Sequence, residues 1–149
     1  MPKEPIARGV VLHHAKEGPL PTLAREAQSI LRALDAPADA DAPAADYVLL
    51  LVEPGGADAE LPDLKDRAAS AVAVAEDAAE GRVAVVAARK RLRAMGATLG
   101  SRELVFSPAQ FGYLGLESDS ARERLEILLR ALVLDAERLR LKREGWEEP

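Results

Sequence analysis

The run Tyr47-Val-Leu-Leu-Leu-Val-Glu53 is the stretch of sequence that decides the fold. It has the length of a strand and no polar alternation, which is typical of a strand buried on both faces in a parallel sheet. Two further apolar runs, Ile6–His13 and Arg82–Ala88, alternate with helical patterns around it. This alternation predicts a β-α-β-α-β chain with helices on both faces of a parallel sheet.

Four segments carry apolar residues at helical spacing and predict helices. The helices should begin near Pro21 or Thr22, at Pro62, after Arg89 and at Ser120, where Ser120 and Glu123 have the spacing of a capping box. Arg102–Phe106 predicts a fourth strand. We therefore expect one three-layer α/β domain over residues 1–149, with a mainly parallel sheet of at least four strands and a long C-terminal helix over 120–144.

Composition limits the class of protein. The chain has 149 residues, 48% of them hydrophobic, which suits a single domain with a sizeable core. It has no cysteine, which excludes disulfides, thiolate catalysis and sulfur-ligated zinc. No apolar run approaches the ~18 residues of a membrane span, and residues 1–5 lack a signal-peptide pattern. We expect a cytoplasmic protein without membrane contact, in which the acidic, Ala/Pro-rich segment 35–45 is a flexible loop.

Charge is unevenly distributed along the chain. The formal net charge is −5, which argues against a general nucleic-acid binder. Nine carboxylates lie between Asp35 and Asp66, whereas six basic residues and no acid lie between Arg82 and Arg102. Each stretch either forms a solvent-exposed face or forms a surface that binds a partner.

Ligands of an open parallel sheet bind outside the carboxyl ends of its strands. The predicted strands place there His13 or His14, Glu53, and the basic trio Arg89, Lys90 and Arg91. We expect the trio at a helix start, where the helix dipole disfavours cations and a bound anion would relieve the conflict. The alternative is that these side chains extend into water.

Several chemistries lack their motifs. Adjacent residues on a strand point to opposite faces, so His13 and His14 cannot easily share a metal ion, and no ligand spacing exists elsewhere. Gly55-Gly56 lacks the rest of a P-loop, no dinucleotide glycine pattern follows a strand, and no Gly-x-Ser-x-Gly elbow exists. We expect no metal, no cofactor and no covalent catalysis.

Apolar residues at two places predict an interface for a protein partner or for self-association. One place is the loop between the last strand and the last helix, and the other is the second apolar face of that helix. The residues are Phe111 and Tyr113 in the loop, and Ile127, Val133, Leu134 and Leu141 on the helix. The alternative for both places is burial in a broad core.

Read as a string of elements over residues 9–106, with Gly18-Pro19-Leu20 opening the first helix, the chain resembles the STAS family of anti-sigma-factor antagonists. The resemblance implies a non-catalytic regulatory module that binds a protein partner. The family's phosphorylated serine has no counterpart, because no Ser or Thr occurs between Pro54 and Ser70; Asp58 and Glu60 would at most imitate its charge. The alternative is a small enzyme or binding domain for an anionic metabolite, phosphate- or carboxylate-bearing, at the carboxyl edge of the sheet.

Overall fold

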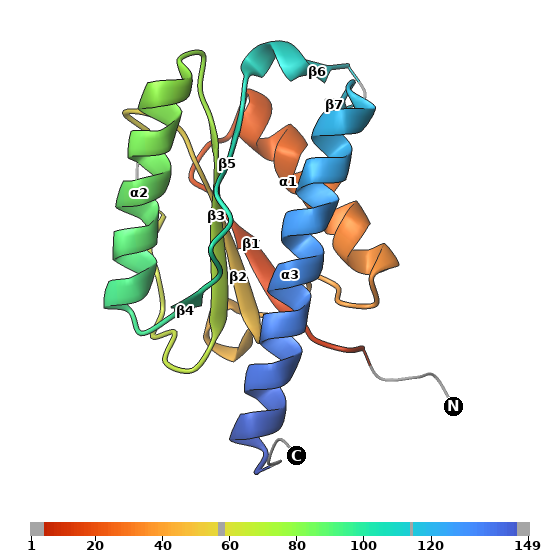
Figure 1. Ribbon diagram of the computed structural model, residues 1–149, viewed down its shortest axis with the longest axis vertical. Coiled ribbons are helices and arrows are strands. Elements are labelled where there is room, and N and C mark those ends of the chain that lie inside the picture. The colour runs from red at the N-terminus through yellow and green to blue at the C-terminus, as the bar shows by residue number, and fades with distance from the viewer. Residues whose placement is uncertain (1–4, 57–58, 114, 146–149) are drawn as a thin grey trace.

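Three helices cover the two faces of a five-stranded sheet in the computed structural model, which describes residues 5–56, 59–113 and 115–145 (Figure 1). The helices are α1 (Pro19–Ala33), α2 (Ala78–Ala94) and α3 (Asp119–Arg143). The strands of the sheet are β1 (Gly9–Leu12), β2 (Tyr47–Val52), β3 (Ala68–Val74), β4 (Thr98–Leu99) and β5 (Leu104–Phe106). A hairpin, β6 (Phe111–Gly112) and β7 (Gly115–Leu116), and two short 3-10 turns, η1 (Ala42–Ala44) and η2 (Pro108–Gln110), complete the elements.

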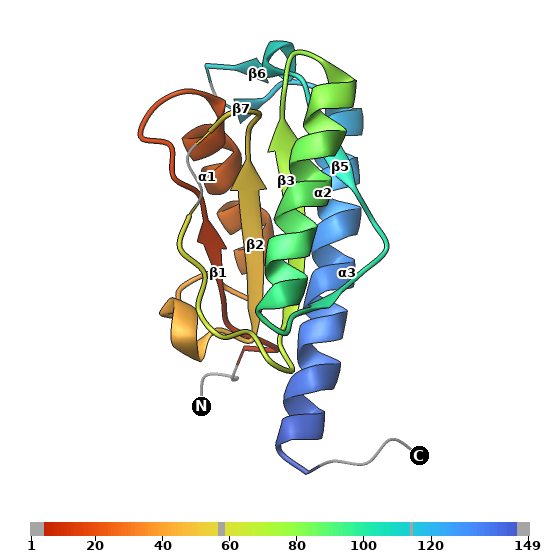
Figure 2. The same ribbon diagram turned by 90° about the vertical axis from the view of Figure 1, so that its left-hand side faces the viewer.

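All strand pairs of the large sheet are parallel, which confirms the predicted fold class. The order is β1-β2-β3, and both β4 and β5 then pair with β3. Figure 2 shows β1, β2 and β3 side by side with their arrows pointing upward, and α2 in front of the β3 side of the sheet. The central strand β2 is buried along almost its whole length, as its unbroken apolar run predicts.

The edge of the sheet beyond β1 is occupied by the acidic segment that follows α1. The amide of Ile6 donates to Asp35 O, the amide of Gly9 donates to Pro37 O, and Gly9 O accepts from the amide of Ala40. Residues 35–40 therefore run in the same direction beside residues 6–9, at the start of β1, as an irregular edge segment. By position across the sheet, the order is 35–40, β1, β2, β3 and then β4 with β5.

The middle of the chain differs from the sequence prediction. Residues 68–74, expected inside the helix that starts at Pro62, form β3, and residues 82–88, expected as a strand, lie inside α2. Alanine is a strong helix former and valine a strong strand former, so local propensity favoured the wrong element in both places. Tertiary packing decides instead: β3 is buried on both faces, whereas Val83 and Val86 are exposed on α2.

Two apolar cores lie on opposite faces of the sheet. On one face, α1 and α3 pack on β2 residues such as Leu49 and Leu51. On the other, α2 and the segment 59–64 pack on Val48 and Leu50 and on the alanines of β3. Gly81 lets α2 approach β5 closely, because a Cβ added to it would be 2.4 Å from Val105 Cγ1.

An ionic cluster closes the amino edge of the sheet. The carboxylate of Asp46 accepts a bond from Arg143 Nη2 at 2.9 Å and from the amide of Arg8 at 3.0 Å, and lies 3.8 Å from Arg67 Nη1. Burial lowers the pKa of Arg143, and the positive charge of Arg67 lowers it further. The cluster joins the starts of three strands to the end of α3. None of the helices in the described residues is long and apolar enough to cross a membrane.

Candidate functional site

The carboxyl edge of the sheet, at the top of Figure 1, carries the turns in which the sequence predicts a site. After β1, the turn 13–18 leads into α1 through Gly18, whose φ of 90° suits glycine. Two of the first three residues of α1 are Pro19 and Pro21, which have no N–H group. Of the four amides at this helix end, only those of Gly18 and Leu20 can bind a ligand.

The turn after β2 positions Glu53. The amide of Gly56 donates to Glu53 O at 3.1 Å, and Gly55 has a φ of 70°, so Glu53 to Gly56 form a type II turn with Pro54 and Gly55 at its centre. A Cβ on Gly56 would be 2.8 Å from Glu53 Cγ. The Glu53 side chain therefore lies over Gly56, and any larger residue at position 56 would displace it.

The basic trio does not lie at a helix start, and the expectation of a dipole conflict there is wrong. Arg89, Lys90 and Arg91 occupy the second half of α2, close to its carboxyl end, where cations are favourable. Arg89 Nη1 donates to Gly100 O at 2.8 Å, and Arg91 Nη2 donates to Ala59 O at 2.5 Å. Both arginines therefore hold neighbouring loops in place.

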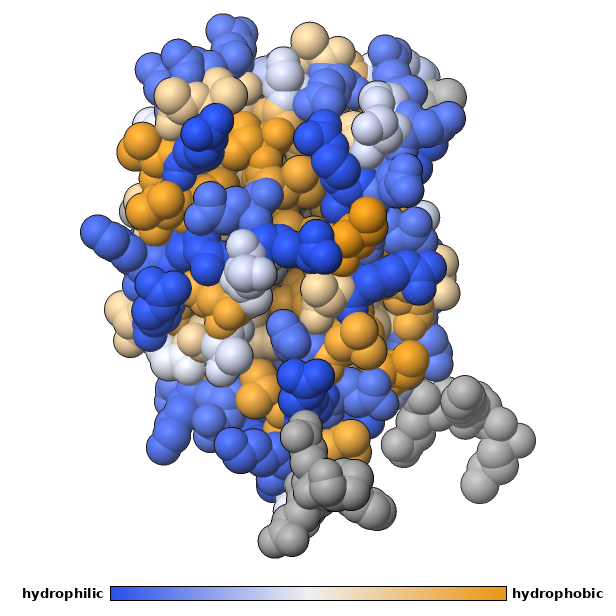
Figure 3. Space-filling view, in the orientation of Figure 1, coloured by the Kyte–Doolittle hydropathy of each residue, from blue (hydrophilic) through white to orange (hydrophobic). Residues whose placement is uncertain are grey.

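A groove of about 620 Å³ lies between the turn after β2 and α2. Its apolar lining comes from Val52, Val83, Ala84, Ala87 and Ala88. Figure 3 shows apolar surface over the upper part of α2, which agrees with the exposure of Val83 and Val86.

Charged residues stand at the two ends of this groove. Glu53 and Glu80 line one end, and Lys90 and Arg91 line the other. Lys90 is exposed and has no hydrogen-bond or ion-pair partner within the described residues. The structure thus brings together Glu53, Lys90 and Arg91 from the predicted set, while Arg89, His13 and His14 do not line the groove.

The start of α2 is closed to anions. The side chain of Asp77 caps this helix, and its Oδ1 accepts from the amides of Ala79 at 2.7 Å and Glu80 at 3.3 Å. Sequence reasoning missed this helix start, although Asp77 followed by Glu80 has the spacing of a capping box. Around His13, the atom Nδ1 is buried without a partner in the described structure, whereas His14 is exposed.

The predicted interface residues fall into different environments. Phe111 packs edge-on against buried Phe106, with ring centroids 6.2 Å apart, whereas Tyr113 is fully exposed in the β6–β7 hairpin. On α3, Val133 is buried in the core beneath the helix, Leu141 is partly exposed, and Ile127 and Leu134 are exposed. A continuous apolar face that includes Val133 therefore does not form, because that side chain points into the core.

The capping of α3 also differs from the prediction. Ser118, not Ser120, is the N-cap: its Oγ accepts from the amide of Ala121 at 3.2 Å. No group of three or more His, Asp or Glu residues in the described ranges could hold a metal ion. Asp58, part of the expected charged segment, lies outside the described residues.

No family model and no curated protein matches the sequence. The fold is similar to solved flavodoxins. An archaeal flavodoxin superposes with a TM-score of 0.64 at 10% identity over 87% of this chain and 98% of its own. Oxidised flavodoxin 1 from Bacillus cereus gives 0.64 at 16% identity over 86% and 98%. The flavodoxin of Streptococcus pneumonia TIGR4 gives 0.60 at 18% identity over 85% and 97%.

This similarity overturns the STAS resemblance and the regulatory module that it implied. That resemblance used residues 82–88 as a strand, and they are helical. The sheet agrees with the flavodoxin-like order 2-1-3-4-5, with the irregular segment 35–40 in the place of the second strand. In such a sheet the order reverses between β1 and β2, and ligands bind at that point of the carboxyl edge.

Proposed function

We propose that this chain is a binding domain for a small, largely apolar ligand with one anionic group, held in the groove between residues 52–56 and α2. The observation that carries the proposal is the groove itself, which begins at the carboxyl end of β2 and has apolar walls and a lysine without a partner among the residues that the structure describes. Ligand sites combine such apolar linings with a few polar groups that fix orientation. Lys90 would bind the anion, and Glu53 at the opposite end would accept a hydrogen bond from the ligand.

The position of the groove supports the proposal. Val52 and Glu53 end β2, one of the two strands that flank the reversal of sheet order, where ligands of this class of fold bind; the turn 13–18 after β1 does not line the groove. The volume of about 620 Å³ lies within the range of roughly 300–1,000 Å³ that small-molecule sites occupy. Arg91, which donates to Ala59 O, would add positive potential at the same end without leaving its own bond.

A flavin, which flavodoxins hold at this edge, does not fit the residues present. The turn 13–18 and the residues up to Pro21 contain no Ser or Thr hydroxyl, and Pro19 and Pro21 remove two of the four amides that would face a phosphate. The turns after β2 and β3 contain no aromatic residue against which a flavin ring could stack. We therefore propose a ligand other than a flavin.

Binding of two matched fluorescent probes tests the proposal. 8-Anilinonaphthalene-sulfonate carries an apolar ring system and an anion, whereas N-phenyl-naphthylamine has the same rings without the charge. We expect saturable binding of the sulfonate to the folded protein and a five- to tenfold weaker affinity in Lys90→Ala, since each tenfold corresponds to about 1.4 kcal/mol. Affinity for the neutral probe should not change.

Arg93→Ala is the matched control, because Arg93 is an exposed cation on the same helix that does not line the groove. Equal binding of the sulfonate by wild type, Lys90→Ala and Arg93→Ala would contradict the proposal, and so would the absence of saturable binding. A thermal melt of each variant verifies that the fold is retained.

A further inference from the structure

The sheet has a gap beside β3, on the side where β4 and β5 pair with it. Leu99, the last residue of β4, is opposite Ala69, and Leu104, the first residue of β5, is opposite Val72. From Leu99 to Leu104 the chain advances by five residues, whereas their partners on β3 are only three residues apart. The linker 100–103 therefore bulges away from the sheet. Arg89 holds this linker from the α2 side, since it donates to Gly100 O at 2.8 Å and lies 3.9 Å from Glu103 Oε1.

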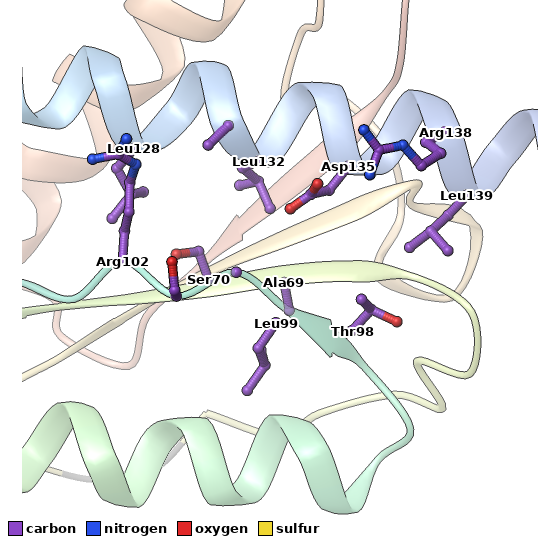
Figure 4. Close-up of a pocket in the computed structure, with 13 residues that line it drawn as sticks. Ala69, Ser70, Thr98, Leu99, Arg102, Leu128, Leu132, Asp135, Arg138 and Leu139 are labelled. Atoms are coloured by element: carbon purple, nitrogen blue, oxygen red, sulfur yellow. The ribbon is translucent and has the colours of Figure 1, made fainter.

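A cavity of about 400 Å³ lies behind this linker, on the face covered by α3 (Figure 4). Its apolar walls include Leu128, Leu132 and Leu139 of α3. It is separate from the groove of the proposed function, because the groove lies on the α2 face and shares no lining residue with this cavity.

Ser70 supplies a hydroxyl group to the cavity. It is the buried polar residue of the described core, with 8% of its surface exposed, and its side chain faces the cavity (Figure 4). Ala68, Val72 and Val74 are its neighbours on the same face of β3, so a serine there has no packing advantage. Its hydroxyl has no hydrogen-bond partner in the described residues, and its oxygen is open to the cavity, so a ligand or water there can supply one.

Opposite charges stand at the two ends of the same cavity. Asp135 of α3 is half-buried, reaches across to the linker, and has no ion-pair partner in the described residues; its Oδ2 would be 3.6 Å from a Cβ on Gly100. Arg102 of the linker lies beside Leu128, which precedes Asp135 by seven residues on α3 (Figure 4). Arg102 has no hydrogen-bond or ion-pair partner in the described residues. Arg138, which also lines the Asp135 end, is engaged in an interaction of its own.

We propose that this cavity binds a linear ω-amino carboxylate. Asp135 binds the ammonium group, Arg102 binds the carboxylate, Ser70 donates or accepts one hydrogen bond between them, and the three leucines contact the methylene chain. Seven helical residues advance by about 10 Å, so the two charged side chains suit a ligand whose own charges are several ångströms apart. An α-amino acid with a short side chain has its charges too close together to contact both ends.

Titration calorimetry with a chain-length series tests this assignment: glycine, β-alanine, γ-aminobutyrate, δ-aminovalerate and ε-aminohexanoate. We expect saturable binding that is tightest for one of the last three. Hexanoate, hexylamine and adipate, which each lack one of the two charges or replace it, should bind at least about tenfold more weakly. Asp135→Asn and Arg102→Ala should each weaken the best ligand by a similar factor.

Ser70→Ala separates a ligand-binding role from a structural one. If the hydroxyl serves the ligand, this variant loses affinity while its melting temperature stays close to that of wild type, because the hydroxyl has no hydrogen-bond partner in the described residues. Lys90→Ala, in the other groove, should leave binding unchanged. The proposal is overturned if no member of the series binds, if adipate or hexylamine binds as well as the best ω-amino acid, or if Asp135→Asn has wild-type affinity.

Discussion

Tyr47→Phe is expected to reveal a buried phenol that links the central strand to the edge of the sheet. Tyr47 has no exposed surface, and its hydroxyl donates to Ala36 O at 2.6 Å. Its ring covers Gly9, where an added Cβ would be 2.2 Å away. Phenylalanine keeps the ring but leaves the Ala36 carbonyl without this partner, which should lower the free energy of unfolding by about 1–3 kcal/mol. A loss of 2 kcal/mol corresponds to a fall in Tm of roughly 4–8 °C at this chain length.

The same substitution should change the pH dependence of stability. Burial raises the pKa of Tyr47 above its usual value, and the charges of Asp39 and Asp46 raise it further. Above pH 10 the unfolded chain loses the phenolic proton that the folded chain retains, so the folded state binds more protons and wild-type stability falls as pH rises. At pH 11 this loss amounts to about 1.4 kcal/mol for one such group with an ordinary pKa near 10 when unfolded.

Urea unfolding at pH 7, 10 and 11, monitored by circular dichroism, measures both effects. The stability advantage of wild type over Tyr47→Phe should be greatest at pH 7 and should shrink by about 1.4 kcal/mol at pH 11. All other ionisable groups are common to both proteins and cancel in the difference. A difference that stays constant from pH 7 to 11 would refute the reasoning, because it would mean that the phenol ionises equally in both states.

Three further substitutions test local features. Ser118→Ala should cost about 1 kcal/mol, the usual value of an N-cap, whereas Ser120→Ala should change stability little; equal effects in urea titrations would contradict the assigned cap. Arg89→Ala should cost about 1.5–3 kcal/mol, because a charged donor to Gly100 O is lost, and a melting temperature equal to wild type would show that this bond contributes nothing. Leu134→Glu should leave monomer stability within about 0.5 kcal/mol, while light scattering over a concentration series shows whether this exposed leucine supports self-association.

The elements before residue 62 and after residue 100 could be predicted from the sequence because pattern and environment agree there. The apolar run at β2 and the long helical stripe of α3 have strong periodicity, and both elements occur as expected. The middle could not be predicted, because β3 is built from five residues of Ala and Ser among seven, a composition that favours helix. Only the packing of α2 against those small side chains makes a strand the better solution, and that contact is not visible in a local window.

The candidate site could be predicted from the sequence only where it adjoins a correctly predicted element. Glu53 follows a correctly predicted strand, so its place at the carboxyl edge could be derived from the sequence. Lys90 and Arg91 line the groove from within α2, not from a turn after a strand as predicted. They were predicted at the positive end of a helix dipole, but they lie near its negative end. The pair Ser70 and Asp135 could not be predicted from the sequence, because the two residues line one cavity only as a result of the gap between β4 and β5.

The strand order also has a consequence for synthesis of the chain. Neighbouring strands β1, β2 and β3 are consecutive in sequence, and β5 joins β3 after α2, so no strand has to be inserted between two that are already paired. The sheet can therefore grow in the order in which the ribosome delivers it. The face beneath α3, with Leu49 and Leu51, remains only half covered by α1 until the last helix emerges. During that interval it is the surface most exposed to aggregation, and the one a chaperone would bind.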